Sequence, residues 1–600
     1  MPSPSQSQSL IAPSLFKEFL HGEDVSSWGG FVFPEANRRK ELSPSGGKCM
    51  ATRRRPRLGQ WEVYIVPHFH YDAAWLETYE GYLRITHPYI LEVLRALEME
   101  PGFKFVFDQV ALLEPFLERY PEQKEKLKRF VEEGRIELTC GMFVMPDVNL
   151  PGGESLLRQV LLGQEFFQRE FGMRPKVGYM LDVFGNHPQM PQIMVGLGFT
   201  SYIFGRVRPP ESPADFYWEG LDGTRILTHW MPYHYVDFWP APTTQEEFEA
   251  FAQAAIERMK PYATGNKMLL FNGMDFVPPQ PHVVPLARWY NETHSDARLH
   301  IVTPSEYLEA IRGEDLPVVQ GDFNAVFQGC YSSRIRLKQE NRRLENVLLS
   351  AEAWTAVASL VGSVDLEQHQ QEMKKAWRKV LFNHFHDVIC GCHVDAVYEE
   401  AMEGYRVAGE MGSRQLETAL AIVSEHVSTL SPGVPVLVFN TLAWPRTDVA
   451  SVVVTITRPG VRNLGVLDAE GKPVPSQLEE VVRYGDGGLK SARVFFLAEV
   501  PGLGYALYHI VEEALGPAST TLKALDPIEV SRHHPHHCIL ENEFYRLTLD
   551  NWGGVITSLL YKPLDWEVID PAKPYGNVIT KEPDHGDLWE INGPCKGGAT

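Results

Sequence analysis

Between residues 60 and 330, short strand-like runs alternate with stretches of helical periodicity, and this alternation constrains the fold more than any other feature. The predicted strands are Trp61–Val66, Arg135–Thr139, Val177–Leu181, Tyr202–Phe204 and Met268–Phe271. Apolar residues recur at helical spacing over Pro88–Met99 and Gln109–Gly134. Short buried strands separated by helices are typical of a largely parallel sheet that is covered on both faces. We therefore predict an α/β domain over residues 59–334.

Two regions with different patterns follow this predicted domain. Residues 335–430 contain almost no proline, and Trp377, Val380 and Leu381 illustrate a helical spacing that predicts a bundle of about three helices. Beyond Pro432, β-rich segments separated by turns predict a β-sandwich-like domain over 431–600. These segments are Val436–Phe439, Val449–Ile456, Val494–Leu497, Ala506–Val511 and Phe544–Leu549. We expect this last domain to be incomplete, and residues 1–58 to be a loosely structured extension.

Composition excludes several classes of protein. The 600 residues carry a net charge of −21, which argues against nucleic-acid binding, because phosphate recognition requires clustered Lys and Arg. The one basic run, Arg53–Arg57, is interpreted as a solvated tail. No apolar run is long enough for a transmembrane helix, and the N-terminus lacks a secretory signal. The seven cysteines are scattered and odd in number, which favours reduced thiols in a cytoplasmic protein.

Polar clusters follow three of the predicted strands. His68, His70 and Asp72 come after the first, Asp182 follows Leu181, and Asp275 follows Phe271. Ligand sites of parallel α/β sheets collect at the carboxyl ends of strands, and residues i and i+2 of an extended segment share a face. Imidazole and carboxylate are suitable Zn²⁺ ligands. The alternative is a set of loop histidines that make structural hydrogen bonds.

A fourth cluster, His384–Asp387, lies near the end of a predicted helix. Alone it is interpreted as a polar helix terminus. Together the four clusters provide enough ligands for one divalent ion and a pair of carboxylates. Two carboxylates that flank a glycosidic bond act as nucleophile and as acid/base, and the acid requires a raised pKa.

These motifs resemble glycoside hydrolase family 38, the class II α-mannosidases, from about Trp61 to the end of the chain. The family's first motif is similar to His68–Asp72, which implies that His70 and Asp72 bind the metal and that His68 is a neighbour. The family's Asp-x-Phe-Gly motif corresponds to Asp182–Gly185, so Asp182 is implied to be both nucleophile and ligand. The His-Asp pair implies His386 as the fourth ligand and Asp387 as a sugar-hydroxyl contact.

The resemblance also implies roles for residues outside the metal motifs. Asp275 corresponds to the acid/base and Trp75 to the aromatic residue beneath the sugar. Arg206 corresponds to an arginine near the nucleophile, and its offset of 24 residues from Asp182 fits the family. A family tyrosine near the site corresponds to Tyr235, with Tyr233 as the alternative. The expected architecture is an α/β domain with a largely parallel, seven-stranded-barrel-like sheet, a helical bundle and a β-sandwich-like region.

The sequence departs from the family pattern at three places near these motifs. Ala73-Ala74 replaces the usual Pro-Gly, Met274 replaces a second acidic residue, and Gly391-Cys392 replaces Gly-Thr or Gly-Ser. A thiolate–metal interpretation of Cys390-x-Cys392 is a minor alternative, because four N/O ligands already complete a site. The His533–Cys538 cluster is interpreted as a solvated turn.

The leading hypothesis is a retaining, exo-acting α-mannosidase that needs Zn²⁺, with Co²⁺ as the alternative ion. Its expected partner is a mannose-containing oligosaccharide, with neither nucleic acid nor membrane, and a homo-oligomer is left open. Two alternatives belong to other classes. One is a metal-dependent carbohydrate deacetylase, in which the metal activates water and no nucleophile is needed. The other is a mannose-binding protein without catalysis.

Overall fold

The computed structural model describes residues 60–579 and residue 589; residues 208, 210–211, 325, 431, 513–536 and 574 are outside the description. The chain divides into two units, Met1–Arg57 and Leu58–Thr600, and the first lies wholly outside the described residues. The predicted extension over 1–58 and most of the His533–Cys538 cluster therefore stay predictions.

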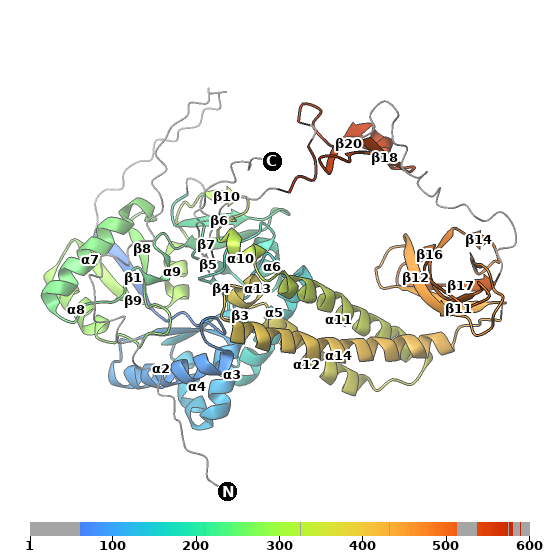
Figure 1. The fold of residues 1–600 in the computed structure, drawn as a ribbon. Coiled ribbons are helices and arrows are strands. Elements are labelled where there is room, and N and C mark those ends of the chain that lie inside the picture. Colours follow the sequence, from blue (N-terminus) through green and yellow to red (C-terminus); the bar gives the residue numbers. More distant parts are fainter. Residues whose placement is uncertain are drawn as a thin grey trace, which may run out of the picture. The chain divides into compact units, whose positions relative to one another are not determined.

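Ten strands and nine helices alternate over the first 270 described residues or so, which confirms the α/β prediction (Figure 1). The strands are β1 (Trp61–Pro67), β2 (Phe105–Gln109), β3 (Ile136–Met142), β4 (Val177–Met180), β5 (Ser201–Phe204), β6 (Asp215–Glu219), β7 (Arg225–Trp230), β8 (Lys267–Asn272), β9 (Ala297–Ile301) and β10 (Val318–Gln320). The helices are α2 (Tyr79–Met99), α3 (Val110–Arg119), α4 (Lys124–Glu132), α5 (Gly153–Phe171), α6 (Met190–Gly196), α7 (Gln245–Met259), α8 (Val283–Thr293), α9 (Pro304–Ile311) and α10 (Gln328–Ser332).

The strands form three hydrogen-bonded groups, in the orders β8-β1-β9, β10-β6-β7-β5-β4 and β2-β3. All pairs are parallel except β6 with β7. Strands β4 and β5 are buried along their whole length, as expected for strands covered on both faces. A largely parallel arrangement is confirmed, whereas a closed seven-stranded barrel stays a prediction.

Prolines explain the differences between predicted and observed helices. Helix α2 begins at Tyr79 rather than at Pro88, because the Thr78 side chain caps its first turn and Pro88 is accommodated inside the helix. The predicted helix over Gln109–Gly134 is interrupted at Pro121, which lacks an N–H group and restricts the residue before it. Strands β2, β6, β7, β9 and β10 were not predicted; β2 is short and wholly buried.

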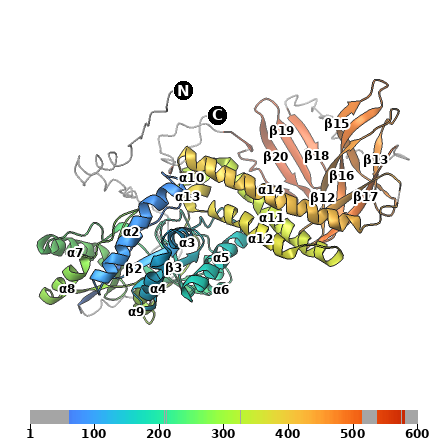
Figure 2. The same cartoon turned by 90° about the horizontal axis from the view of Figure 1, so that it is seen from below.

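Three long helices and one short helix follow, which confirms the helical region. They are α11 (Ile335–Val361), α12 (Leu366–Phe382), α13 (His386–Cys390) and α14 (Asp395–Glu425). Helices α11 and α14 run side by side in both ribbon views (Figures 1 and 2). Gly412 permits this close approach, because a Cβ atom there would lie 2.6 Å from a Leu348 methyl carbon.

The C-terminal region contains antiparallel sheets. Two of them, β11-β17-β13-β14 and β12-β16-β15, contribute side chains to one hydrophobic cluster, and a third has the order β18-β19-β20-β21. The strands are β11 (Val434–Asn440), β12 (Arg446–Thr455), β13 (Leu464–Leu467), β14 (Pro473–Val474), β15 (Ser476–Arg483), β16 (Leu489–Val500), β17 (Gly504–Glu512), β18 (His537–Glu541), β19 (Tyr545–Asp550), β20 (Val555–Tyr561) and β21 (Trp566–Glu567). The predicted β-structure is confirmed; the sandwich and the domain boundaries stay predictions.

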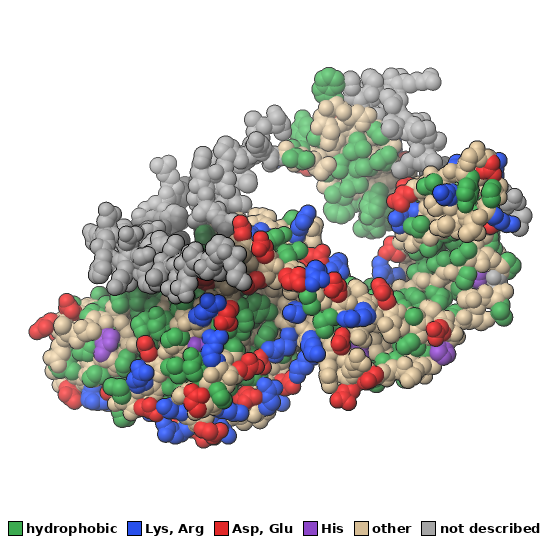
Figure 3. Space-filling view, turned by 60° about the horizontal axis from the view of Figure 1, so that its bottom comes forward, with side chains coloured by type: hydrophobic (Ala, Val, Ile, Leu, Met, Phe, Trp, Pro, Cys, Tyr) green, Lys and Arg blue, Asp and Glu red, His purple; other side chains and the backbone are tan. Residues whose placement is uncertain are grey.

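The surface and the helices bear on the predicted partners. On the face seen in Figure 3, acidic and basic side chains are intermingled rather than gathered into a large basic patch. Among the described helices, none combines the length and hydrophobicity that crossing a bilayer requires. The predicted absence of nucleic-acid and membrane partners stays a prediction.

Candidate active site

The parallel pairing of β1 with β8 brings His70 beside Asp275. The last pair of the ladder is Pro67 with Asn272, and His70 and Asp275 each stand three positions beyond it. The pairing continues that far, since the His70 N–H group donates to the Met274 carbonyl at 3.1 Å and His70 and Asp275 form an isolated bridge. Strand register therefore places an imidazole and a carboxylate at the same sheet edge.

The same principle brings Asp182 beside Arg206. Strands β4 and β5 end at the pair Met180–Phe204, and Asp182 and Arg206 each stand two positions beyond it. The Arg206 guanidinium forms an ion pair with Asp182 Oδ1. The sequence offset of 24 residues between them is thus a consequence of strand register.

Glycines let these paired segments approach closely. A Cβ atom at Gly273 would lie 2.1 Å from the His68 carbonyl oxygen, and one at Gly205 would lie 2.3 Å from that of Leu181. In both places the obstacle is backbone, which cannot rotate away. Glycine is therefore required where each pair of strands extends into the site.

His386 begins the short helix α13, opposite the loop that follows β3. Its N–H group donates to the Met145 carbonyl oxygen at 3.2 Å, and its ring atom Nδ1 donates to the same oxygen at 3.1 Å. Because Nδ1 is the donor, the lone pair of the neutral ring lies on Nε2 and faces the other clusters. Asp387 follows in the first turn of α13 and is also buried.

The predicted ligands lie close together, and His70, Asp182 and His386 each offer a ligand atom within 4.8 Å of the other two. His70 Nε2 lies 3.0 Å from Asp72 Oδ1 and 4.0 Å from Asp182 Oδ2, and His386 Nε2 lies 3.8 and 3.7 Å from the same two oxygens. Ligand atoms at about 2.1 Å from a tetrahedral ion are separated by roughly 3.4 Å. The buried Nε2 atom of His386 has no hydrogen-bond partner among the described residues. This donor set fits a divalent cation such as Zn²⁺.

The two carboxylates predicted to be catalytic have opposite protonation tendencies. Burial alone would raise the pKa of Asp182, but the Arg206 guanidinium and His386 hold it well below its usual range. Burial, followed by the charge of Asp72, raises the pKa of Asp275 to about 7. Burial also raises the pKa of Asp387, to about 8. Of the two predicted catalytic carboxylates, Asp182 therefore stays ionised and Asp275 holds a proton near neutral pH, which is the arrangement of a nucleophile and a general acid.

Comparison with known proteins decides the family. Residues 60–328 match the model described as "Glycosyl hydrolases family 38 N-terminal domain", and residues 325–422 match the "Alpha mannosidase middle domain". The two matches together cover residues 60–422 without a gap, and this range includes all the side chains of the candidate site. The chain belongs to glycoside hydrolase family 38.

Relatives of this family 38 chain carry related names. Human "Alpha-mannosidase 2C1" is 27% identical over 549 residues, which are 89% of this chain and 47% of the relative. A "Putative mannosylglycerate hydrolase" of Halalkalibacterium halodurans is 25% identical over 363 residues, 56% of this chain and 40% of the relative. The chain thus spans about half the length of these curated relatives, or less.

A solved relative supports the family 38 fold. The crystal structure of an alpha-mannosidase from Enterococcus faecalis V583 superimposes with a TM-score of 0.70 at 25% identity, covering 85% of this chain and 61% of the other. The order of α/β, helical and antiparallel β regions is consistent with this likeness.

Of the two candidate tyrosines, one contacts a predicted catalytic carboxylate. The Tyr235 hydroxyl donates to Asp275 Oδ1 at 2.8 Å, whereas Tyr233 is exposed and lies against Arg258, so geometry favours Tyr235. Trp75 is half-buried, and its carbonyl oxygen accepts from the N–H group of Val394, just beyond α13.

Two histidines near the site have roles that sequence patterns did not separate. His68 Nε2 donates to the Tyr235 carbonyl oxygen at 2.9 Å, so it supports the site from behind, in agreement with its predicted role as a neighbour. His234 was missed, although its Nε2 lies 3.5 Å from Asp182 Oδ1. Burial and the nearby Arg206 lower the pKa of His234 to about 3, so its ring is neutral. Its only sequence signal was proximity to Tyr235.

The cysteines at the end of α13 and just beyond it retain their protons rather than acting as thiolate ligands. Cys390 Sγ lies 3.6 Å from Asp147 Oδ2, and Cys392 Sγ lies 3.0 Å from Asp387 Oδ1. Burial raises the pKa of both thiols well above the usual range. A protonated thiol is a poor metal ligand, which weakens the thiolate–metal alternative.

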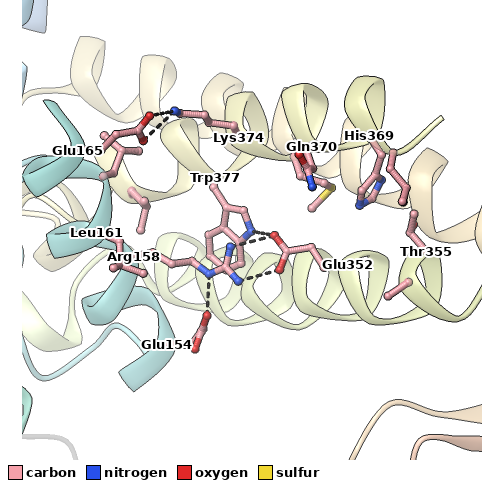
Figure 4. A pocket seen from close by; sticks show the side chains of 15 residues that line it. Glu154, Arg158, Leu161, Glu165, Glu352, Thr355, His369, Gln370, Lys374 and Trp377 are labelled. Atoms are coloured by element: carbon pink, nitrogen blue, oxygen red, sulfur yellow. Dashed lines mark hydrogen bonds and ion pairs between the residues drawn. The ribbon is translucent and has the colours of Figure 1, made fainter. Parts of the chain in front are cut away.

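A separate cavity of about 530 Å³ lies between α5, α11 and α12 (Figure 4). Arg158 donates to both carboxylate oxygens of Glu352 and stacks on Trp377, whose Nε1 donates to Glu352 Oε1. None of the candidate catalytic or metal-binding residues lines this cavity. The contacts of Arg158 with Glu352 and Trp377 connect the α/β region to the helices.

Proposed function

We propose that the protein is a metal-dependent, retaining and exo-acting α-mannosidase. The observation that carries this proposal is the contrast between Asp182 and Asp275, whose surroundings drive their pKa values in opposite directions within one site. Retention requires one carboxylate to attack the anomeric carbon while a second protonates the leaving oxygen. The names of the relatives supply the sugar, α-mannose.

In this proposal Asp182 is the nucleophile. Its Oδ1 is paired with Arg206 and its Oδ2 lies toward His386, so the carboxylate is ionised and its orientation is fixed from both sides. A fixed, ionised carboxylate loses little entropy on reaching the anomeric carbon. The C–O bond to the leaving group breaks as Asp182 forms a covalent glycosyl ester.

Asp275 is the proposed acid/base. The Tyr235 hydroxyl donates to Oδ1, which leaves Oδ2 to carry the transferable proton. Asp275 gives this proton to the leaving oxygen in the first step. In the second step it accepts a proton from the water that hydrolyses the glycosyl ester, which regenerates both carboxyl groups.

His70, Asp72, Asp182 and His386 would hold the metal ion. When bound, the ion supplies positive charge that polarises sugar hydroxyl oxygens and keeps the neighbouring carboxylates ionised. Two imidazoles and two carboxylates suit Zn²⁺, and Co²⁺ accepts the same ligands. Trp75, Arg206, Tyr235 and Asp387 are the proposed sugar contacts.

The proposed substrate is a mannose-containing oligosaccharide or glycoconjugate with a terminal α-linked residue. Because one relative is named as a putative mannosylglycerate hydrolase, mannosylglycerate, which has a small charged aglycone, should also be tested as a substrate. A cytoplasmic location is also proposed, supported by the few, scattered and odd-numbered cysteines of the sequence.

The product anomer tests this function. Hydrolysis of an aryl α-mannoside, followed by proton NMR, should first yield α-mannose, and dialysis against a chelator should abolish the activity until Zn²⁺ or Co²⁺ is restored. Early β-mannose would contradict retention. Full activity in metal-free protein would contradict the metal site. Release of acetate from an acetylated sugar, without mannoside cleavage, would support the deacetylase instead.

A further inference from the structure

The segment after α13 folds back on the helix and places a thiol against Asp387. Gly391 adopts a left-handed conformation with φ of 86°, and its N–H group donates to the Asp387 carbonyl oxygen at 3.0 Å. Cys392 therefore returns to the first turn of α13, where its Sγ atom lies 3.0 Å from Asp387 Oδ1. Both side chains are at least 95% buried.

The two oxygens of Asp387 have different surroundings. Oδ1 accepts a hydrogen bond from the Cys392 thiol, whereas Oδ2 lies 3.6 Å from His386 Nε2, on the side of the predicted metal ligands. A buried carboxylate with a single neighbour at one oxygen keeps torsional freedom about its Cβ–Cγ bond. A donor at Oδ1 restricts that freedom and fixes the direction in which Oδ2 accepts.

We propose that Cys392 is a positioning residue for sugar binding, which acts by donating its S–H hydrogen to Asp387 Oδ1 and thereby aiming Oδ2 at a hydroxyl of the bound mannose. This inference rests on the proposed function. A hydroxyl donates to a carboxylate at least as well as a thiol does, so serine at position 392 should replace the cysteine in this role.

Cys390 provides a matched control two positions earlier. It is equally buried and lies in the same hydrophobic cluster as Cys392, but its thiol is directed at Asp147. Asp147 also accepts from the Tyr331 hydroxyl and from two backbone N–H groups, so loss of the Cys390 thiol leaves it satisfied. Cys390→Ala therefore reports the cost of deleting a buried thiol near the site without releasing Asp387.

Steady-state kinetics on an aryl α-mannoside test the role. Cys392→Ala should raise KM about 3- to 10-fold, the loss expected for one hydrogen bond of about 0.7 to 1.4 kcal/mol, with a smaller change in kcat. Cys392→Ser should restore KM, and Cys390→Ala should leave it unchanged. An unchanged KM in Cys392→Ala, or a failure of serine to rescue it, would overturn the proposal.

A double-mutant cycle tests whether Cys392 acts through Asp387. In an Asp387→Ala background the thiol has no acceptor, so adding Cys392→Ala should change kcat/KM by less than about 1.5-fold. A merely structural role would instead give the full loss in both backgrounds.

Infrared spectroscopy tests the hydrogen bond without reference to activity. The S–H stretching band of Cys392, assigned by its loss in Cys392→Ala, should move to higher frequency in Asp387→Ala. A band that does not move would overturn the proposal even in an active enzyme. If the parent protein proves inactive on mannosides while the band does move, the proposed function fails and the thiol contact stands.

Discussion

At the residue scale, the two catalytic candidates differ in their neighbours rather than in their chemistry. Asp182 contacts a guanidinium, whereas Asp275 contacts a tyrosine hydroxyl and lies near the negative charge of Asp72. Both are aspartates that follow a strand by a few residues. Their different proposed roles, nucleophile and acid/base, therefore follow from the neighbours that the paired strands bring to each. Replacing one carboxylate at a time tests these roles.

Asp275→Ala should damage cleavage in proportion to how poor the leaving group is. For a disaccharide or alkyl mannoside we expect a loss of about 10²- to 10⁴-fold in kcat/KM, because the leaving oxygen is no longer protonated. A dinitrophenyl mannoside, whose leaving group departs unprotonated, should lose far less. Azide, which needs no base, should then accelerate turnover and give a glycosyl azide of retained configuration.

The variant should keep its metal ion and its fold, since Asp275 is not among the proposed ligands. Equal losses on both kinds of substrate, with no effect of azide, would remove Asp275 from the role of acid/base. Asp182→Ala serves as the contrasting variant, because it should lose both turnover and metal affinity.

Residue patterns indicated the candidate ligands but not the contacts that support them. His70, Asp72, Asp182 and His386 stand in motifs whose spacing can be read along the chain. The choice of Tyr235 over Tyr233, and the approach of His234 to Asp182, depend on the turn after β7. His234 has a φ of 65°, and no local sequence pattern predicts this left-handed conformation for a non-glycine residue.

At the scale of elements, strand register determines which side chains meet. The β1–β8 and β4–β5 ladders end two or three residues before the functional side chains, and each extension passes a glycine. A local pattern can predict the strands, but register depends on pairing between segments about 200 residues apart for β1 and β8. Both helices predicted with bounds in the α/β region differ from the observed ones at a proline, because Pro88 lies inside α2 whereas Pro121 follows the end of α3.

Gly273→Ala tests the importance of this close approach. Its Cβ atom would require the backbone at His68 to move, so we expect a loss of roughly 2 to 3 kcal/mol in the free energy of unfolding, together with weaker metal binding. Gly196→Ala is the matched control, because Gly196 ends α6 with open space around its Cα atom. Denaturant titration should show little change for the control. Equal stability of the two variants would refute the steric argument.

Asp237, whose side chain contacts β8 near the end of that strand, predicts that the stability of the fold depends on pH. Its Oδ1 accepts from the Phe271 N–H group at 2.6 Å, its Oδ2 has no partner among the described residues, and burial raises its pKa to about 7. Between about pH 4 and 7 the folded protein holds a proton here that the unfolded chain, with an ordinary Asp pKa near 4, has released. The contribution of this group to stability therefore falls as the pH rises from about 4 to 7 and is constant above.

Asp237→Asn removes the charge and keeps an acceptor for Phe271. The variant should match the parent near pH 5 and exceed its free energy of unfolding by about 2 to 4 kcal/mol at pH 8. Chemical denaturation at the two pH values provides the measurement. A difference that is the same at both pH values would show that burial does not perturb Asp237.

At the scale of the whole molecule, the proposed metal ion connects segments that are distant in sequence. Its ligands follow β1 and β4 and begin α13, so binding joins the α/β region to the helical region. Burial alone would lower the pKa of His70, but Asp72, Asp182 and Asp275 raise it to about 10, and the pKa of His386 is also raised. A proton therefore occupies the His70 imidazole near neutral pH when no cation does, and the raised pKa of His386 favours its protonation as well.

Metal binding should consequently release protons and stabilise the fold. Calorimetry of Zn²⁺ binding at pH 7, in buffers of different ionisation enthalpy, should show net release of at least one proton. At a free Zn²⁺ concentration of about 100 times Kd, the free energy of unfolding should rise by about 2.7 kcal/mol. His386→Ala should lose most of both effects. Heats that do not depend on the buffer would contradict protonated histidines in the metal-free site.

The central claim is that Asp182 forms a covalent bond to the sugar, and trapping that bond tests it most directly. A 5-fluoro mannosyl fluoride should react with the metal-loaded protein, because its fluoride leaves readily while the ring fluorine slows release of the glycosyl group. Mass spectrometry of the intact protein should show one added glycosyl group, and peptide sequencing should place it on Asp182. A glycosyl group on another residue, or turnover with no covalent adduct, would contradict the account.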